Sequence, residues 1–78
     1  LSNAKVYPVP TTDKVTVELM NNSGAVVYIY DMLGQLVNSY KMDNSKLTID
    51  VSTLSGNFLL KVITPDNTVN NFRIVITK

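Results

Sequence analysis

Three stretches of the chain place apolar side chains at every second position. Residues 14–19, 46–51 and 72–77 each alternate Val, Leu, Ile or Phe with polar or smaller residues. Successive side chains of a β-strand point to opposite faces, so a period of two indicates a strand with one buried and one wet face. The pattern predicts three half-buried strands.

Two further stretches, residues 25–30 and 58–63, are apolar at both parities. This is expected of central strands that are covered on both faces. No stretch of eleven residues shows the stripe of an amphipathic helix. The β-branched residues Val, Ile and Thr make up 24 of the 78 residues, and such side chains suit a pleated sheet. We therefore expect an all-β protein.

Turn residues separate these runs at nearly even spacing. Residues 21–24, 31–34, 43–45 and 65–67 are rich in Asn, Asp, Ser, Gly or Pro. Asp31 can bond its own backbone, Gly34 can adopt a left-handed bulge conformation, and Pro65 suits the first central position of a type I turn. Short loops between strands predict an antiparallel β-sandwich of six or seven strands.

We expect the sandwich to be monomeric, with a core drawn from the strands and from a Leu54 side chain that packs inward from a loop. Tyr28 and Tyr30 share one parity of a central strand, and we expect them to pack in the core or between the sheets. The predicted core comprises Val15, Val17, Val27, Ile29, Leu47, Ile49, Leu54, Leu60, Val62, Phe72 and Ile74.

The length of 78 residues allows one domain, which we place at residues 5–78. Residues 1–4 are interpreted as a cloning scar or a linker. The seven basic and six acidic residues nearly balance, with a net charge of +1, so the charge does not indicate a nucleic-acid or membrane-surface partner. With no Cys and no His, packing and backbone hydrogen bonds must hold the domain together.

The same absences argue against catalysis. The common general base, the thiolate nucleophile and the usual transition-metal ligands are missing, and the three glycines are too far apart for a phosphate-binding loop. We expect no enzyme activity, no cofactor and no resident metal. Asp31, Asp43 and Asp66 are most simply turn residues, although carboxylates on loops leave calcium binding open.

Four segments carry recognisable motifs. Residues 6–17 open with Tyr-Pro-x-Pro, residues 27–37 contain Tyr-Asp-x-x-Gly, residues 49–62 contain Asp-Val-Ser-x-Leu-x-Gly-x-Phe, and residues 71–78 form a closing strand. Each motif alone is weak, but in this order and spacing they resemble the type A C-terminal sorting domain of the type IX (Por) secretion system of Bacteroidetes. The resemblance covers residues 5–78, and its motif positions are Tyr7, Pro8, Pro10, Tyr30, Asp31, Gly34, Asp50, Leu54, Gly56 and Phe58.

Three positions depart from the family pattern. Val9 stands where Asn is usual between the two prolines, the step from Leu54 to Gly56 is one residue shorter, and Phe58 replaces the commoner Tyr.

The resemblance implies an immunoglobulin-like sandwich that acts as a C-terminal sorting signal. It implies that the domain directs a larger cargo protein through the periplasm and across the outer membrane of a Gram-negative bacterium, to the cell surface or the medium. The implied partners are the outer-membrane translocon, a surface sortase-like protease and the preceding cargo domains.

The closing strand is the candidate for partner recognition. It is long and β-branched, it has no Pro, and its charges are Arg73 and Lys78. A partner could read such a strand by surface contact or by strand addition, or the strand could simply complete the core. The candidate residues are Phe72, Arg73, Ile74, Val75, Ile76, Thr77 and Lys78.

Two other functions remain open from the residues alone. One is an accessory adhesion or carbohydrate-binding sandwich, which would need exposed aromatic side chains on one face. The other is a structural spacer. The absence of Trp favours sorting over carbohydrate binding.

Overall fold

A computed structural model of the protein describes residues 4–7, 11–19 and 24–77. These residues contain seven β-strands, and no helix among them is long and apolar enough to cross a membrane. The strands are β1 (Ala4–Tyr7), β2 (Lys14–Leu19), β3 (Val26–Tyr30), β4 (Leu36–Lys41), β5 (Lys46–Asp50), β6 (Gly56–Ile63) and β7 (Val69–Ile76).

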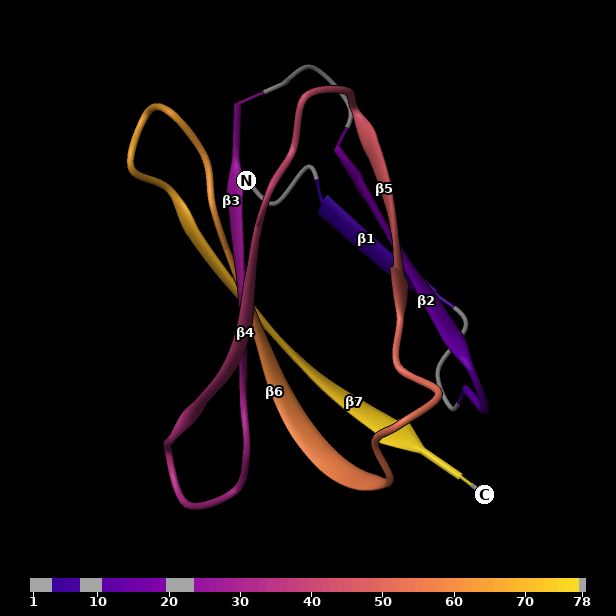
Figure 1. Ribbon diagram of the computed structural model, residues 1–78. Coiled ribbons are helices and arrows are strands. Elements are labelled where there is room, and N and C mark those ends of the chain that lie inside the picture. Colours follow the sequence, from indigo (N-terminus) through magenta and orange to yellow (C-terminus); the bar gives the residue numbers. More distant parts are fainter. Residues whose placement is uncertain (1–3, 8–10, 20–23, 78) are drawn as a thin grey trace.

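The strands form two antiparallel sheets that face each other (Figure 1). One sheet has the order β1-β2-β5 and the other has the order β4-β3-β6-β7. This division matches strands A-B-E and C′-C-F-G of the immunoglobulin fold. The predicted all-β sandwich of six to seven strands is confirmed.

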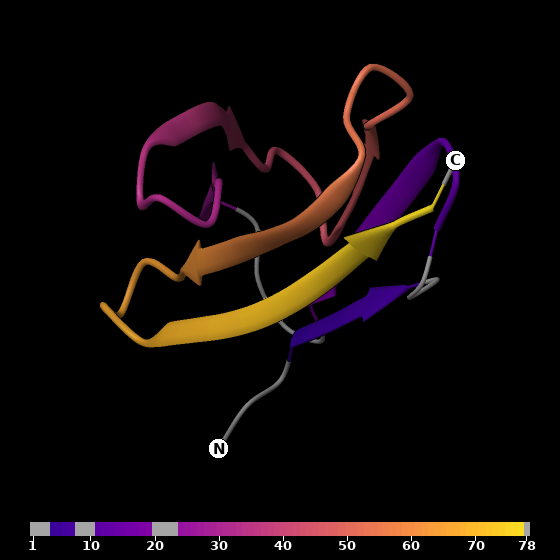
Figure 2. The ribbon, with the colours of Figure 1, turned by 90° about the horizontal axis from the view of Figure 1, so that it is seen from below.

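β6 and β7 form the longest ladder and run side by side along the molecule (Figure 2). Their register extends from Gly56 opposite Ile76 to Ile63 opposite Val69. At the other end of the chain, Ala4, which belongs to the segment interpreted from the sequence as a cloning scar or a linker, is the first residue of β1 and pairs with Leu19.

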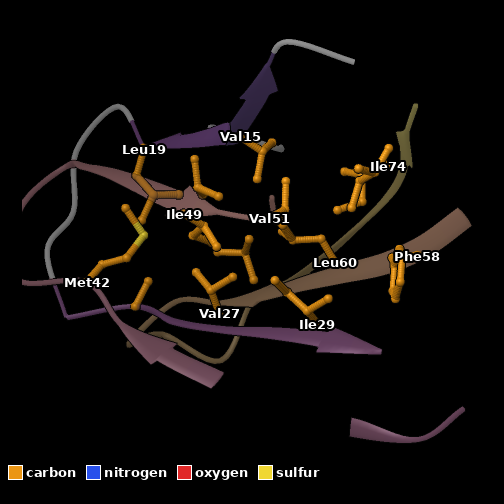
Figure 3. Close-up of a cluster of buried hydrophobic side chains, with 14 residues drawn as sticks. Val15, Leu19, Val27, Ile29, Met42, Ile49, Val51, Phe58, Leu60 and Ile74 are labelled. Carbon is orange, nitrogen blue, oxygen red and sulfur yellow. The ribbon is translucent and has the colours of Figure 1, made fainter. Parts of the chain in front are cut away.

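The core lies between the sheets (Figure 3). Val15 and Ile49 enter it from the three-stranded sheet, while Val27, Ile29 and Leu60 enter it from the four-stranded sheet. Eight of the eleven predicted core residues are buried: Val15, Val17, Val27, Ile29, Ile49, Leu60, Val62 and Ile74.

The other three predicted core residues, Leu47, Leu54 and Phe72, are only partly buried against the cluster. Leu47 and Phe72 lie on β5 and β7, which are edge strands, and Leu54 lies in the loop before β6. Edge strands and loops have fewer neighbours to cover them. Six further buried residues complete the core: Leu19, Ala25, Met42, Val51, Phe58 and Ile76.

β3 and β6 are central strands, as the two doubly apolar stretches predicted, but the expectation that both of their faces are covered is wrong. The sandwich has only two layers, so each sheet has one face outside. On the outer face of the four-stranded sheet, Val26, Tyr28 and Tyr30 are partly buried, and Leu59 is exposed.

The segment that precedes β2 binds the C-terminal end of β7. Thr11 forms a parallel bridge to Ile76, its amide donates to the carbonyl of Val75 (2.9 Å), and its carbonyl accepts from the amide of Thr77 (2.8 Å). These bonds join the two sheets at one edge of the sandwich. Pro8, Val9 and Pro10 lie outside the described residues.

The turn between β6 and β7 has the predicted chemistry. The amide of Asn67 donates to the carbonyl of Thr64 (2.9 Å), which places Pro65 at the first central position. Asn67 adopts a φ of 68°, in the left-handed region that Asn tolerates. The Asp66 carboxylate accepts hydrogen bonds from the hydroxyl of Thr64 and from the amide of Thr68 (3.1 Å).

Those hydrogen bonds lower the pKa of the Asp66 carboxyl, with the Thr64 hydroxyl as the main cause. A carboxyl whose pKa is lower in the folded state stabilises the fold above its unfolded pKa of about 3.9, and this contribution is lost as the pH falls further. We expect Asp66→Asn to lose less of its stability on acidification than the unmutated chain. Urea denaturation at about pH 6 and about pH 3 measures this, and an identical loss in both proteins would contradict it.

Candidate functional site

The outer face of the four-stranded sheet carries aromatic side chains that the sequence analysis placed in the core. Val27 and Ile29 are buried between the sheets, so Tyr28 and Tyr30 point outward from the same strand. The expectation that these tyrosines pack in the core or between the sheets is therefore wrong. Both are partly buried by their neighbours on the outer face.

The register of the strand pairs shows which residues lie beside these tyrosines on neighbouring strands. Tyr30 lies opposite Leu36 on β4 and Leu59 on β6, and Leu59 lies opposite Arg73 on β7. In the next row Tyr28 lies opposite Lys61. Residues that are directly opposite in a ladder have side chains on the same face. The outer face thus combines aromatic, aliphatic and cationic side chains.

An open groove of about 460 Å³ lies at the end of this face, beside the β3–β4 turn. It is lined by Tyr30, Asp31, Met32, Gly34, Phe58, Leu59, Lys61 and Arg73. We call this set the outer groove. Its residues come from three strands and one turn that are adjacent in the sheet.

Tyr30 of the outer groove interacts with the neighbouring Tyr28 and with Lys61. The rings of Tyr28 and Tyr30 have centroids 6.3 Å apart and are tilted by 41°. The Nζ atom of Lys61 lies 5.4 Å from the centroid of the Tyr30 ring, within the range of a cation–π interaction. One face of the Tyr30 ring is therefore covered by a positive charge.

The β3–β4 turn is fixed by Asp31 and Gly34, as predicted. The Asp31 Oδ1 atom accepts from the amides of Leu33 and Gln35, both at 2.9 Å, and Gly34 has a φ of +84°. A side chain at Gly34 would meet no other atom but would strain the backbone. This turn presents Met32 and Leu33 to solvent with 60% and 85% of their surface exposed.

The closing strand divides by parity. Ile74 and Ile76 are buried in the core and Phe72 is half-buried against it, whereas Arg73 and Thr77 are exposed and Val75 is partly buried. Of these residues, Arg73 lines the outer groove. Lys78 lies outside the described residues.

The structure brings together only some of the motif positions. Tyr30, Asp31, Gly34 and Phe58 line the outer groove. Asp50 accepts from the amide of Ser52 (2.9 Å), Leu54 packs against the core, and Gly56 opens β6 with a φ of +101°. These three positions have local structural roles.

Tyr7 lies on the other sheet. Its hydroxyl donates to the Glu18 Oε1 atom (2.7 Å) across the β1–β2 pair, and this bond raises the pKa of the Tyr7 phenol. Pro8 and Pro10, the remaining motif positions, lie outside the described residues.

The turn carboxylates do not form a metal-binding cluster in the part of the chain that the structure describes. No group of three or more His, Cys, Asp or Glu residues there could hold a metal ion. Asp31 and Asp66 instead accept hydrogen bonds from the backbone of their own turns. The outer groove combines the apolar surfaces of Tyr30, Met32 and Leu59 with the charges of Asp31, Lys61 and Arg73.

Met32, Leu59 and Lys61 line the outer groove but were not among the candidate residues. Leu59 and Lys61 lie in residues 58–63, the run that is apolar at both parities, and this run was their signal in the sequence, whereas Met32 lies in the β3–β4 turn. In such a run, the residues of one parity fill the core, and the residues of the other parity lie on the outer face.

Comparison with known proteins identifies the domain. A family model described as a secretion system C-terminal sorting domain matches residues 5–77. The chain belongs to this family. The resemblance to type IX sorting domains is thereby confirmed, and the sorting domain is a signal for export across the outer membrane to the cell surface or the medium.

Two larger proteins contain a similar segment. The ulvan lyase NLR42 of Nonlabens ulvanivorans is 33% identical in an alignment 78 residues long, which covers 97% of this chain and 15% of the lyase. PorZ, a bacterial surface component of the type IX secretion system of Porphyromonas gingivalis, matches with a TM-score of 0.80 and 21% identity. That match covers 96% of this chain and 11% of the PorZ chain, and it shows the shared fold.

Proposed function

We propose that this sorting domain is a folded export signal attached to a larger cargo protein, and that the outer-membrane translocon of a type IX system reads it. The observation that carries the proposal is the size of the match. The segment of the related lyase that matches this chain makes up only 15% of that protein. This is the proportion expected of a sorting domain that is joined to a much larger cargo protein.

In this proposal the domain is a substrate of the machinery and has no catalytic role of its own. The translocon recognises the folded sandwich, and a surface sortase-like protease then removes it from the cargo domains that precede it. A rigid, two-layer domain with a well-packed core suits this task, because a partner can recognise a preformed surface without first ordering it.

We also propose that part of the sorting information lies in residues 72–78. Phe72, Ile74 and Ile76 face the core, so the side chains that a partner can reach include Arg73 and Thr77. Strand addition to β7 is limited to its earlier half, because Thr11 already bonds the carbonyl of Val75 and the amide of Thr77.

The test attaches the domain to a secreted fluorescent reporter in a host with a working type IX system. We expect the reporter to reach the cell surface or the medium, whereas the same reporter with an unrelated β-sandwich of similar size stays in the periplasm. Protease accessibility of the reporter on intact cells measures delivery. Retention of both fusions in the periplasm would overturn the proposal.

A further inference from the structure

The outer groove contains two positive charges without an anionic partner among the described residues. Lys61 contacts the Tyr30 ring, and neither Lys61 nor Arg73 forms an ion pair in the described part of the chain. Asp31, the one acidic lining residue, directs its Oδ1 atom at two backbone amides of its own turn. The groove therefore has a net charge of +1, and its cations are available to a ligand.

The outer groove is also bordered by exposed aliphatic side chains. They stand at surface positions where a small sandwich would be expected to have polar residues. Met32, Leu33 and Leu59 are exposed beside it, with Leu59 on a central strand. Exposed apolar side chains that gather at one place mark contact sites more often than scattered ones do. Met adds an adaptable surface of the kind that interfaces use.

We propose that the outer groove is the surface through which a protein of the secretion machinery reads the folded domain, by means of an acidic peptide segment that carries a bulky apolar side chain. The carboxylate of that segment contacts Lys61 and Arg73, and its apolar side chain lies against Tyr30, Met32 and Leu59. This inference rests on the sorting function proposed above and assigns the surface of the domain that the partner protein recognises.

The groove suits a peptide better than an acidic saccharide. Sugar rings stack on open aromatic faces, but Lys61 covers one face of Tyr30 and the two tyrosines are tilted by 41°, which leaves no flat platform. Met32 and Leu33 offer no hydrogen bonds to sugar hydroxyls. Together with two cations, these aliphatic side chains are complementary to an acidic and apolar segment.

The experiment reverses the charge of the groove in the reporter fusion. We expect Lys61→Glu with Arg73→Glu to lower surface delivery about tenfold or more, because like charges at a contact oppose binding. Lys61→Arg with Arg73→Lys keeps both charges and should deliver close to the unmutated level. Both residues lie outside the core, so urea denaturation should show folded variants.

The matched control is Lys14→Glu with Lys41→Glu, which makes the same change in net charge. Lys14 and Lys41 are exposed and do not line the groove, and Lys41 lies on the same outer face, opposite Val26. We expect near-normal delivery. Equal delivery of both reversed forms, or equal loss in both, would overturn the assignment to the groove while leaving sorting intact. Failure of the unmutated fusion would instead overturn sorting itself.

Two measurements on the purified chain address other occupants. Calorimetry with polygalacturonate probes acidic saccharides, and sedimentation velocity probes a second copy of the chain. We expect no binding and a monomer. Saccharide binding or dimerisation that Lys61→Glu with Arg73→Glu abolishes would give the groove a different occupant and overturn the proposal.

Discussion

Leu60→Ala is expected to lower the free energy of unfolding by about 2–5 kcal/mol. Leu60 is fully buried on the central strand β6 and contacts the cluster that joins both sheets (Figure 3). A domain of this size has roughly 5 kcal/mol of stability to lose, so a large fraction of the variant should be unfolded at room temperature. Urea denaturation followed by circular dichroism measures the change.

Leu59→Ala is the matched control for that substitution. Leu59 is the preceding residue of the same strand, is 38% exposed and lies on the outer face, so its removal should cost less than about 1 kcal/mol. The two variants delete the same atoms at opposite parities. A larger loss for Leu59→Ala than for Leu60→Ala would mean that β6 is inverted.

Most of the sandwich could be predicted because the alternation of apolar and polar residues shows which face of a strand is buried. On β2 every second residue is apolar, and Val15 and Val17 are buried as this pattern requires. A slip of one residue would put that whole set into water, so the pattern fixes the register of a half-exposed strand. The turns at Asp31 and Pro65 were predictable for a different reason, since their hydrogen bonds are local.

The orientation of the tyrosines could not be predicted in the same way. On β3 both parities are apolar, so the local pattern fits Tyr28 inside as well as Val27 inside. The choice depends on which side chains fill the space opposite β2 and β5. Branched aliphatic residues fill it here, and the tyrosines are left on the outer face.

The outer groove depends on non-local pairing. The sequence motifs pointed to Tyr30, Asp31, Gly34 and Phe58, but nothing in their spacing places Arg73 beside them. The antiparallel ladders β3–β6 and β6–β7 do so, because they align Tyr30 with Leu59 and Leu59 with Arg73. Tyr7 lies on the other sheet. Its sequence motif did not indicate that it is on a different sheet from the groove residues.

Removal of residues 72–78 is expected to unfold the domain. The deletion takes away Ile74 and Ile76, which are buried, most of the partner strand of β6, and the backbone bonds to Thr11. Truncating a single buried Ile to Ala already costs about 2–5 kcal/mol, so two such losses amount to about 4–10 kcal/mol, which is comparable to or larger than the roughly 5 kcal/mol that a small domain has. The shortened chain should show no cooperative thermal transition by circular dichroism.

This outcome bears on how the export signal is located. A truncated fusion that fails to reach the cell surface shows only that the domain must be folded, since the deletion removes core residues together with Arg73. Loss of delivery in a folded variant with a reversed groove charge would instead identify a surface that is read. A truncated chain that still unfolds cooperatively, with near-normal stability, would contradict the placement of β7 in the core and would make residues 72–78 available for recognition as a free segment.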